Sequence, residues 1–305
     1  MAKVNPRQIE AFRALMMTAT TTRAAQVMNV TQPAVSRLVK DLQEALRLTL
    51  FEREGTRLTP TNEALSLYAE VERSFVGLER IAQAAKEIRE RRAGTLRIAG
   101  MPALANGFLP RFAGRFLMAR PGVDIAMFGL MSHMVLDWVV SDQCDFGFAA
   151  GPIQHVAARI EPLPAVRYVA VVPAGHRLAR RRVIRAQDFE RESFIALGPT
   201  TPSKFRLDDL FAREAVPRQV RAETPLSEIA CAMVASGAGV SVVDPFTAAE
   251  FATRGVTARP FEPAVEFQVT ALHPARRTLS AVGREFIHEF SSAIQAFRKE
   301  FRAAS

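Results

Sequence analysis

One stretch of the sequence carries side chains that could pair with nucleic-acid bases, and they recur at helical spacing. At 100° per residue they share one side of a helix that starts at Thr31. Glutamine and arginine can pair bidentately with adenine and guanine edges, and serine and lysine can hold bases or phosphates. This face therefore predicts contact with double-stranded DNA, with a solvated face of an ordinary surface helix as the alternative. The side chains are Gln32, Ser36, Lys40 and Gln43, with Arg37 at the margin.

The elements that must position this face are two short helices joined by a sharp turn. Two helices that cross at a steep angle need a small side chain where they touch, a turn residue four positions on, and branched apolar anchors on the second helix. The spacing of these residue types predicts a helix-turn-helix, whose second helix normally enters the DNA major groove. The small residue is Ala25, the turn residue is Asn29, and the anchors are Val35 and Leu38, with Val39 and Leu42 on the same side of the helix.

Capping residues set the bounds of these helices. Apolar residues at helical spacing predict a first helix over Pro6–Met17. A second helix starts within Thr20–Thr22, any of which can cap it, and ends before Asn29, which tolerates the left-handed conformation of a tight turn. Thr31 can cap the third helix, and Pro33 suits its first turn because a missing N–H costs nothing there.

A hairpin wing is expected after the third helix. The segment Leu50–Thr59 consists of two short extended pieces around Glu54-Gly55. Arg53 and Arg57 flank its tip and could reach phosphates or a neighbouring minor groove, whereas a surface hairpin without DNA contact is the alternative. The expected DNA-contacting residues are Thr31, Gln32, Pro33, Ser36, Arg37, Lys40, Arg53 and Arg57.

A long helical pattern with an apolar stripe runs from Thr61 to Arg91. Its 31 residues would span roughly 46 Å. Because a helix of that length cannot bury its stripe within one small domain, we expect it to pair with a second copy of the chain. The pair would set two recognition helices about one DNA turn, roughly 34 Å, apart. The stripe comprises Leu65, Tyr68, Val71, Phe75, Leu78, Ala82, Ala85 and Ile88, and the charged residues 86–94 are the expected linker.

Length and composition limit the class of protein. The chain has 305 residues, 49% hydrophobic and 23% charged, so two or three folded domains are expected. No apolar run is long enough to cross a bilayer, and the first residues lack the apolar core of a signal peptide. A cytoplasmic protein with no membrane partner is therefore expected. A net charge of +9 favours a polyanionic partner such as nucleic acid, although the run Arg180–Arg182 fits a solvated turn.

The motifs of the common enzyme classes are absent from the sequence. There is no GxSxG or Walker A motif, and Gly237-Ala238-Gly239 leads to Val242 where a dinucleotide fingerprint would need its last glycine. The five histidines are dispersed without metal-ligand spacing. Cys144 and Cys231 fit no CxxC pattern and are expected to be plain core thiols. We therefore expect no catalytic residue, no cofactor and no metal.

Beyond Gly94 the pattern changes to short apolar strands that alternate with amphipathic helices. This alternation is typical of doubly wound α/β lobes, so the whole chain is predicted to be an α+β multidomain protein. The expected strands lie near Leu96–Ala99, Val123–Phe128, Asp145–Phe148, Tyr168–Val172, Phe194–Leu197, Val240–Asp244 and Phe267–Leu272.

Four stretches of the first half resemble the signature of LysR-type transcriptional regulators. They are Ala24-Ala25, Thr31 through Arg37, Leu50-Phe51-Glu52-Arg53 and Leu58-Thr59-Pro60-Thr61. The resemblance continues over essentially the whole chain, including Gly94–Ile98 at the start of the α/β part. Arg47 departs from the pattern, because the family usually has glycine before the wing. The resemblance implies a winged helix-turn-helix, a linker helix and a two-lobed effector domain similar to periplasmic binding proteins. It also implies homodimers or homotetramers on promoter DNA, and contact with RNA polymerase.

The resemblance also implies the domain bounds, because the family's effector domain crosses twice between its lobes. We place the crossings near Leu163 and Phe267. The expected domains are the winged helix-turn-helix at 1–60, the linker and dimerisation helix at 61–93, lobe I at 94–162 plus 268–305, and lobe II at 163–267.

Three further stretches resemble one subgroup of the family, which contains the regulators of lysine biosynthesis and of octopine and nopaline catabolism. They are Phe75–Ile81, Met101–Gly107, and Val242–Pro245 followed by Thr247–Ala249. This resemblance implies an amino acid or an amino-acid-derived opine as the small-molecule effector. Binding would close the lobes and shift the population of DNA-binding states.

Two loops are expected to face the effector, because ligands of open α/β lobes lie beyond the carboxyl ends of strands, near helix N-termini. They are Gly100–Leu104 and Gly198–Pro202. Many family members have Ser or Thr in the first loop, so Pro102 and Ala103 leave a carboxylate to backbone N–H groups. Ordinary loop or core packing is the alternative for each residue, and a purely architectural DNA binder would need no such cleft. The expected effector-contacting residues are Met101, Pro102, Ala103, Leu104, Met131, Phe148, Ala149, Gly198, Pro199, Thr200, Thr201 and Thr224.

Overall fold

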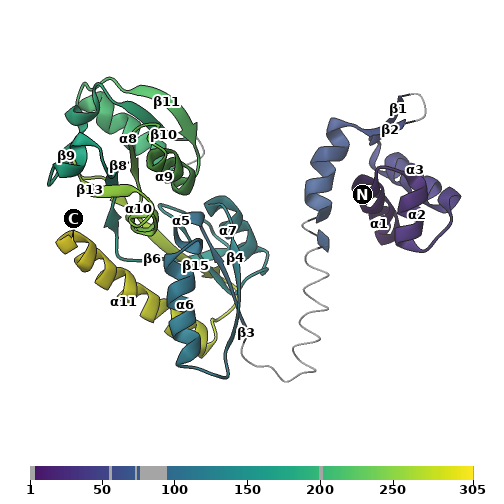
Figure 1. The fold of residues 1–305 in the computed structure, drawn as a ribbon. Helices are drawn as coiled ribbons and strands as arrows, with labels where there is room; N and C mark the ends of the chain where they lie inside the picture. The colour runs from purple at the N-terminus through teal and green to yellow at the C-terminus, as the bar shows by residue number, and fades with distance from the viewer. Residues whose placement is uncertain (1–3, 55–56, 73, 76–94, 199–201, 305) are drawn as a thin grey trace. The chain divides into compact units, whose positions relative to one another are not determined.

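The chain divides into two units, Met1–Arg91 and Arg92–Ser305, which are described separately (Figure 1). The computed structural model describes residues 4–54, 57–72, 74–75, 95–198 and 202–304. Within these residues, no helix is both long enough and apolar enough to span a membrane.

Three helices open the first unit, close to the bounds that the sequence predicts. They are α1 (Pro6–Thr18), α2 (Thr21–Met28) and α3 (Gln32–Leu46). Thr20 caps α2 by accepting a hydrogen bond from the Arg23 N–H. Thr31 occupies the cap position of α3 but its side chain makes no capping hydrogen bond, so the expected cap is wrong in that respect.

Two left-handed residues end the second and third helices. Asn29 has φ 53° and ψ 46°, as the sequence predicts, and the next N–H, that of Val30, bonds back to the Ala25 carbonyl at 3.0 Å. Arg47 has φ 55° and ψ 40° and ends α3. Arginine therefore adopts here a conformation that glycine adopts without a steric penalty, and the turn forms despite the departure from the family pattern.

The wing and the start of the long helix complete the first unit. Strands β1 (Phe51–Glu54) and β2 (Arg57–Pro60) pair antiparallel with Glu54 opposite Arg57, so two residues, 55 and 56, join them. The helix at 62–72 packs Val71 into the same cluster as Phe12 and Leu42, whereas Leu65 remains 54% exposed.

The start of the stripe is thus partly buried by the unit itself, which corrects the expectation that only a second copy could cover it. The later stripe residues from position 78 on lie outside the described residues, so the pairing of this helix stays a prediction.

The second unit contains a five-stranded sheet in the order β4-β3-β5-β15-β6. Strand β3 is parallel to both β4 and β5, and β15 is antiparallel to β5 and β6. The strands are β3 (Thr95–Gly100), β4 (Asp124–Gly129), β5 (Phe146–Ala150), β6 (Ala158–Pro162) and β15 (Val269–Pro274), and the helices beside them are α5 (Pro102–Ala105), α6 (Phe108–Met118), α7 (Ser132–Val140) and α11 (Ala281–Ala304). We call this part lobe I.

The rest of the second unit, lobe II, is built on a four-stranded sheet in the order β12-β8-β13-β9, with the parallel pair β10-β11 joined to it by a bridge between Phe194 and Val240. The strands are β8 (Val169–Pro173), β9 (Ile184–Arg185), β10 (Ser193–Leu197), β11 (Gln219–Thr224), β12 (Ser241–Val243) and β13 (Val256–Glu262), and the helices are α8 (Pro202–Arg213), α9 (Ser227–Ala235), α10 (Pro245–Phe251) and the short 3₁₀ turns η1 (Arg177–Arg180) and η2 (Ala186–Phe189).

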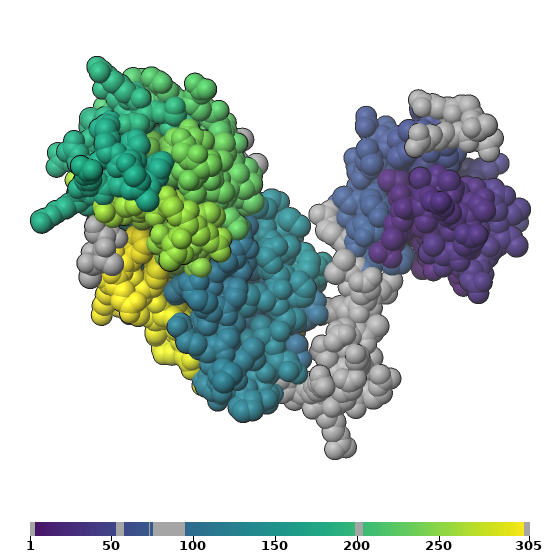
Figure 2. All heavy atoms as spheres, viewed as in Figure 1, coloured from purple at the N-terminus to yellow at the C-terminus, as the bar shows by residue number. Residues whose placement is uncertain are grey.

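Two short strands, β7 (Val166–Arg167) and β14 (Glu266–Phe267), pair antiparallel where the chain passes between the lobes. Figure 2 shows the lobes as adjoining masses, with α11 in yellow against the blue part of lobe I. Both cysteines, Cys144 and Cys231, are buried and free, as the sequence predicts.

All seven expected strands are present, and the predicted α/β class is confirmed. The sequence missed β6, β7, β9, β11 and β13, because these strands carry arginine, glutamate or proline in place of an apolar run. The missed strands include sheet edges, where polar residues and proline are tolerated.

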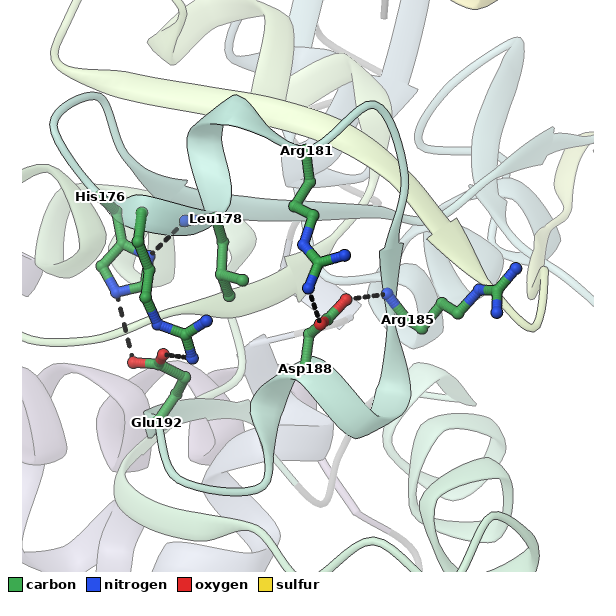
Figure 3. Close-up of polar contacts among 7 residues, drawn as sticks. His176, Leu178, Arg181, Arg185, Asp188 and Glu192 are labelled. Atoms are coloured by element: carbon green, nitrogen blue, oxygen red, sulfur yellow. Dashed lines mark hydrogen bonds and ion pairs between the residues drawn. The ribbon is translucent and has the colours of Figure 1, made fainter.

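The arginine run Arg180–Arg182 of lobe II is exposed, as the sequence predicts, and one of its members, Arg181, takes part in a set of ion pairs and hydrogen bonds with neighbouring residues (Figure 3). Arg181 pairs with Asp188 at 3.3 Å, and Asp188 also accepts the Arg185 N–H at 2.9 Å. Next to them, Glu192 contacts both His176, at 3.2 Å, and Arg177, at 2.6 Å. Part of the positive charge of this surface is therefore compensated within the lobe.

Candidate functional sites

The outer face of α3 projects polar side chains away from the core. On the inner side Val35 and Leu42 have no exposed area and Val39 is 5% exposed. On the outer side, the side chains of Arg37 and Lys40 are 85% and 74% exposed. Gln32 and Ser36 are exposed as well, as are Thr31 and Pro33 at the start of the helix.

The polar groups of this face are weakly held. Gln32 Nε2 donates to Ser36 Oγ and to Thr21 Oγ1, both at 3.2 Å, which orients its amide. Arg37 lies 3.9 Å from Asp41 and Lys40 lies 3.7 Å from Glu44. Exposed pairs of this kind contribute about 0–1 kcal/mol, so both cations can exchange their partners for phosphates at small cost.

Gln43 does not belong to this face, contrary to the prediction. Its Oε1 accepts hydrogen bonds from the N–H groups of Leu50, at 2.7 Å, and Phe51, at 3.1 Å. The side chain therefore fixes the start of the wing to the end of α3. The side chains of Arg53 and Arg57, the expected wing contacts, lie outside the described residues.

A pocket of about 300 Å³ lies between the lobes of the second unit. Two polar contacts join the lobes: Asn106 Nδ2 donates a hydrogen bond to Glu228, and Arg111 forms an ion pair with Glu250. The pocket is lined by Met101, Pro102, Ala103, Met131, Ser132, His133, Leu136, Ala150, Pro152, Ile153, Tyr168, Leu197, Pro225, Leu226, Ser227, Asp244 and Phe267.

Helices from both lobes begin at this pocket. The cap positions of α7 and α9 are Met131 and Leu226, and neither makes a side-chain capping hydrogen bond. Their first N–H groups carry a partial positive charge, which favours an anionic group such as a carboxylate. Ser132 Oγ accepts the Ala150 N–H at 3.1 Å and thereby joins the start of α7 to the end of β5.

Four of the twelve expected effector-contacting residues line the pocket: Met101, Pro102, Ala103 and Met131. Leu104, Phe148, Ala149, Gly198 and Thr224 do not. Leu104, Phe148 and Ala149 have no exposed area, and the Phe148 ring packs 4.4 Å from that of Phe290. Gly198 and Thr224 are joined by a backbone hydrogen bond of 2.7 Å between neighbouring strand ends. The remaining expected residues, Pro199, Thr200 and Thr201, lie outside the described residues.

The sequence missed the most polar part of the pocket, which includes His133, Ser227 and Asp244. Of these, Asp244 is 1% exposed. Its Oδ1 accepts the Thr247 N–H at 2.8 Å, its Oδ2 accepts the Thr247 hydroxyl at 3.0 Å, and Ser227 bonds to the same carboxylate. Burial raises the pKa of the Asp244 carboxyl, and these hydrogen bonds oppose that rise. In the sequence, Asp244 stands before a proline at the end of an apolar strand, which is the pattern of an ordinary helix cap, so its place in the pocket had no signal of its own.

Comparisons with known proteins also divide the chain into a helix-turn-helix part and a substrate-binding part. Residues 6–65 match the family described as "Bacterial regulatory helix-turn-helix protein, lysR family", and residues 89–295 match "LysR substrate binding domain". The octopine catabolism/uptake operon regulatory protein OccR of Rhizobium meliloti is 42% identical, covering 95% of this chain and 96% of its own. The transcriptional activator protein LysR of Escherichia coli is 37% identical, and the match covers 97% of this chain and 94% of that protein.

One solved structure similar to this chain contains nucleic acid. It is full-length CbnR in complex with its target DNA, with a TM-score of 0.72 and 16% sequence identity, covering 92% of this chain and 97% of that one. At that identity the likeness shows the shared fold.

Proposed function

The chain belongs to the LysR family of DNA-binding transcriptional regulators, and on that premise we propose which residues bind DNA and which bind the effector. It is a regulator and not an enzyme. In this proposal the winged helix-turn-helix takes up residues 1–60 and the linker and dimerisation helix 61–93. Lobe I takes up 94–162 plus 268–305, and lobe II takes up 163–267.

The outer face of α3 reads the major groove of promoter DNA. The observation that carries this proposal is that Gln32, Ser36, Arg37 and Lys40 project outward from a helix whose opposite side is buried. The Gln32 amide is oriented by its hydrogen bonds, and Arg37 and Lys40 are free to approach bases or phosphates. Thr31 and Pro33 lie at the end of α3 that enters the groove first, and Arg53 and Arg57 of the wing contact the backbone.

The pocket between the lobes binds an amino acid or an opine-like compound. Its volume of about 300 Å³ suits a small ligand, and the uncapped starts of α7 and α9 offer N–H groups to a carboxylate. The similarity to the regulator named for octopine catabolism supports the same chemical class of effector. Pro199, Thr200 and Thr201 remain proposed contacts, and Met101, Pro102, Ala103 and Met131 form the wall on the side of lobe I.

Effector binding changes the relative population of two sensor conformations and thereby the DNA affinity or the bend of the bound DNA. The links Asn106–Glu228 and Arg111–Glu250 span the two lobes and would respond to any change in their separation. We further propose that the active form is a homodimer or homotetramer, and that it contacts RNA polymerase at the promoter.

Gel retardation tests the DNA-reading face. DNA that binds the wild-type protein is first selected from a random-sequence pool, and Ser36→Ala and Arg37→Ala are then titrated against it. We expect each variant to lose about 5- to 150-fold in affinity, because a good base contact contributes about 1–3 kcal/mol. Arg180→Ala, an exposed arginine of lobe II, is the control for loss of one positive charge. Wild-type affinity of both α3 variants, with unchanged circular dichroism, would overturn the assignment.

A thermal-shift screen with lysine, diaminopimelate, arginine, ornithine and opines tests the effector class independently of DNA. We expect at least one of them to raise the unfolding temperature. If none does while DNA retardation is normal, the effector class is wrong and the DNA-reading assignment stands.

A further inference from the structure

Asp244 contributes a carboxylate to the pocket, and its partners are neutral. It is 1% exposed and receives hydrogen bonds from the Thr247 N–H, the Thr247 hydroxyl and the Ser227 side chain. Within the described parts of the chain, no ion pair joins Asp244 to a lysine, arginine or histidine. A buried carboxylate is normally paired with a cation, because transfer of a lone charge out of water costs several kcal/mol.

The pocket as a whole has the same charge imbalance. Its described lining contains neither lysine nor arginine, and its other groups that can titrate are His133 and Tyr168. The remaining walls are mostly apolar, with Met101, Leu136 and Phe267 among them. An anionic effector with no positive group would therefore meet the Asp244 carboxylate without a compensating side chain nearby.

A purely structural role for Asp244 is the alternative. The residue precedes α10 and caps it through Thr247. Asparagine, however, caps helices as well as aspartate does, so capping alone does not require a negative charge in a buried position. Burial raises the pKa of the Asp244 carboxyl. A cation bound beside the carboxyl would oppose that rise, because it stabilises the ionised form, and the ionised form in turn would bind the cation more tightly.

We propose that Asp244 is the counter-ion of a cationic nitrogen of the effector, an ammonium or guanidinium group, and that this contact selects basic amino acids and their derivatives. The inference rests on the proposed function of the pocket and specifies its ligand. The effector's carboxylate binds at the start of α7, where Ser132 and His133 line the pocket. Its carbon chain lies against the apolar walls between these two ends.

Titration calorimetry on the full-length protein tests the proposal with pairs of ligands that differ in one charge. Arginine and citrulline differ in the side-chain cation, and arginine and Nα-acetylarginine differ in the α-ammonium. We expect the wild-type protein to prefer the more cationic member of at least one pair by tenfold or more. The comparison needs no variant, so it does not depend on how any substitution folds.

The variant Asp244→Asn keeps the cap of α10 and removes the charge. We expect it to bind the preferred cationic ligand at least about tenfold more weakly, because the charge-assisted contact between the ligand's cation and the carboxylate is lost. Affinity for the neutral member of the pair should stay within about twofold. Asp209→Asn, which removes an exposed carboxylate of lobe II, is the matched control and should bind every ligand as the wild type does.

Three results would overturn the proposal in distinguishable ways. Equal affinity for both members of each pair, or wild-type affinity of Asp244→Asn for the cationic ligand, refutes the role of Asp244 and leaves the effector pocket in place. Binding of neither arginine, lysine nor octopine, with normal DNA retardation, refutes the effector class together with this inference. Loss of DNA retardation by the wild-type protein would instead refute the proposed function itself.

Discussion

Replacement of Gln43 by alanine distinguishes a DNA-facing glutamine from one that holds the wing. Its Oε1 accepts the N–H groups of Leu50 and Phe51 at 2.7 and 3.1 Å. Both bonds join the end of α3 to the first residues of the hairpin, so they fix the wing relative to the recognition helix. In Gln43→Ala both N–H groups lose their partner, and the helix keeps a residue of high helix propensity.

The expected effect follows from the number and burial of these bonds. A typical hydrogen bond contributes about 0.5–1.5 kcal/mol net, so the loss of two costs about 1–3 kcal/mol. The site is partly buried and water can replace some of the lost bonding, which favours the lower half of that range. Since 1.4 kcal/mol is a factor of ten, amide exchange of Leu50 and Phe51 should accelerate about 5- to 30-fold.

Hydrogen exchange measured by mass spectrometry on a peptide that covers residues 48–54 reports this change directly. Gln43→Glu is the matched control, because a carboxylate also accepts both N–H groups and should keep exchange close to the wild-type rate. If Gln43→Ala exchanges at the wild-type rate in this peptide and binds DNA more weakly, the side chain acts on DNA and the reasoning fails.

Two further predictions concern the first unit. Arg47→Gly should raise the unfolding free energy by about 0.5–1 kcal/mol, because glycine adopts the left-handed conformation of this position without steric cost; equal denaturation midpoints for the two proteins would contradict it. Glu72 accepts a hydrogen bond from Arg13 Nε at 2.6 Å, which lowers the pKa of its carboxyl. The wild-type protein should therefore be more stable than Glu72→Gln above the unfolded-state pKa of about 4.3, and this difference in stability should disappear as the pH falls through the lowered pKa of Glu72. Urea titrations at pH 7 and below pH 4 measure the difference. A difference that does not change with pH would refute the prediction.

The recognition helix could be predicted from the sequence because the signals that define it are local. Ala25, Asn29 and Val35 lie within eleven positions of one another, and each acts through its own neighbours: a helix contact, a left-handed turn and an inner face. The helical period then places Ser36 and Lys40 on the outside without further information. Gln43 satisfies the same period and was assigned wrongly, because its partners belong to the hairpin and periodicity contains no information about contacts beyond the helix.

The effector pocket could be predicted only in part, because it combines segments that are far apart in the chain. Fold rules place ligands at strand ends, and this identified Met101 to Ala103 and Met131. The rule does not say which side of a strand a residue faces. Phe148 lies in β5, whose last residue, Ala150, lines the pocket, yet the Phe148 ring packs in the core against Phe290.

Asp244 shows why the chemistry of such a pocket is harder to predict than its location. From the sequence, an aspartate before proline at the end of a strand is an ordinary helix cap, and the structure confirms that it caps α10. Its second property is a negative charge in a pocket lined by neither lysine nor arginine among the described residues. That property depends on side chains from segments far apart in the chain, from Met101 to Phe267. The family's fold determines where an effector binds, and a single buried charge of this kind can determine which effector binds there.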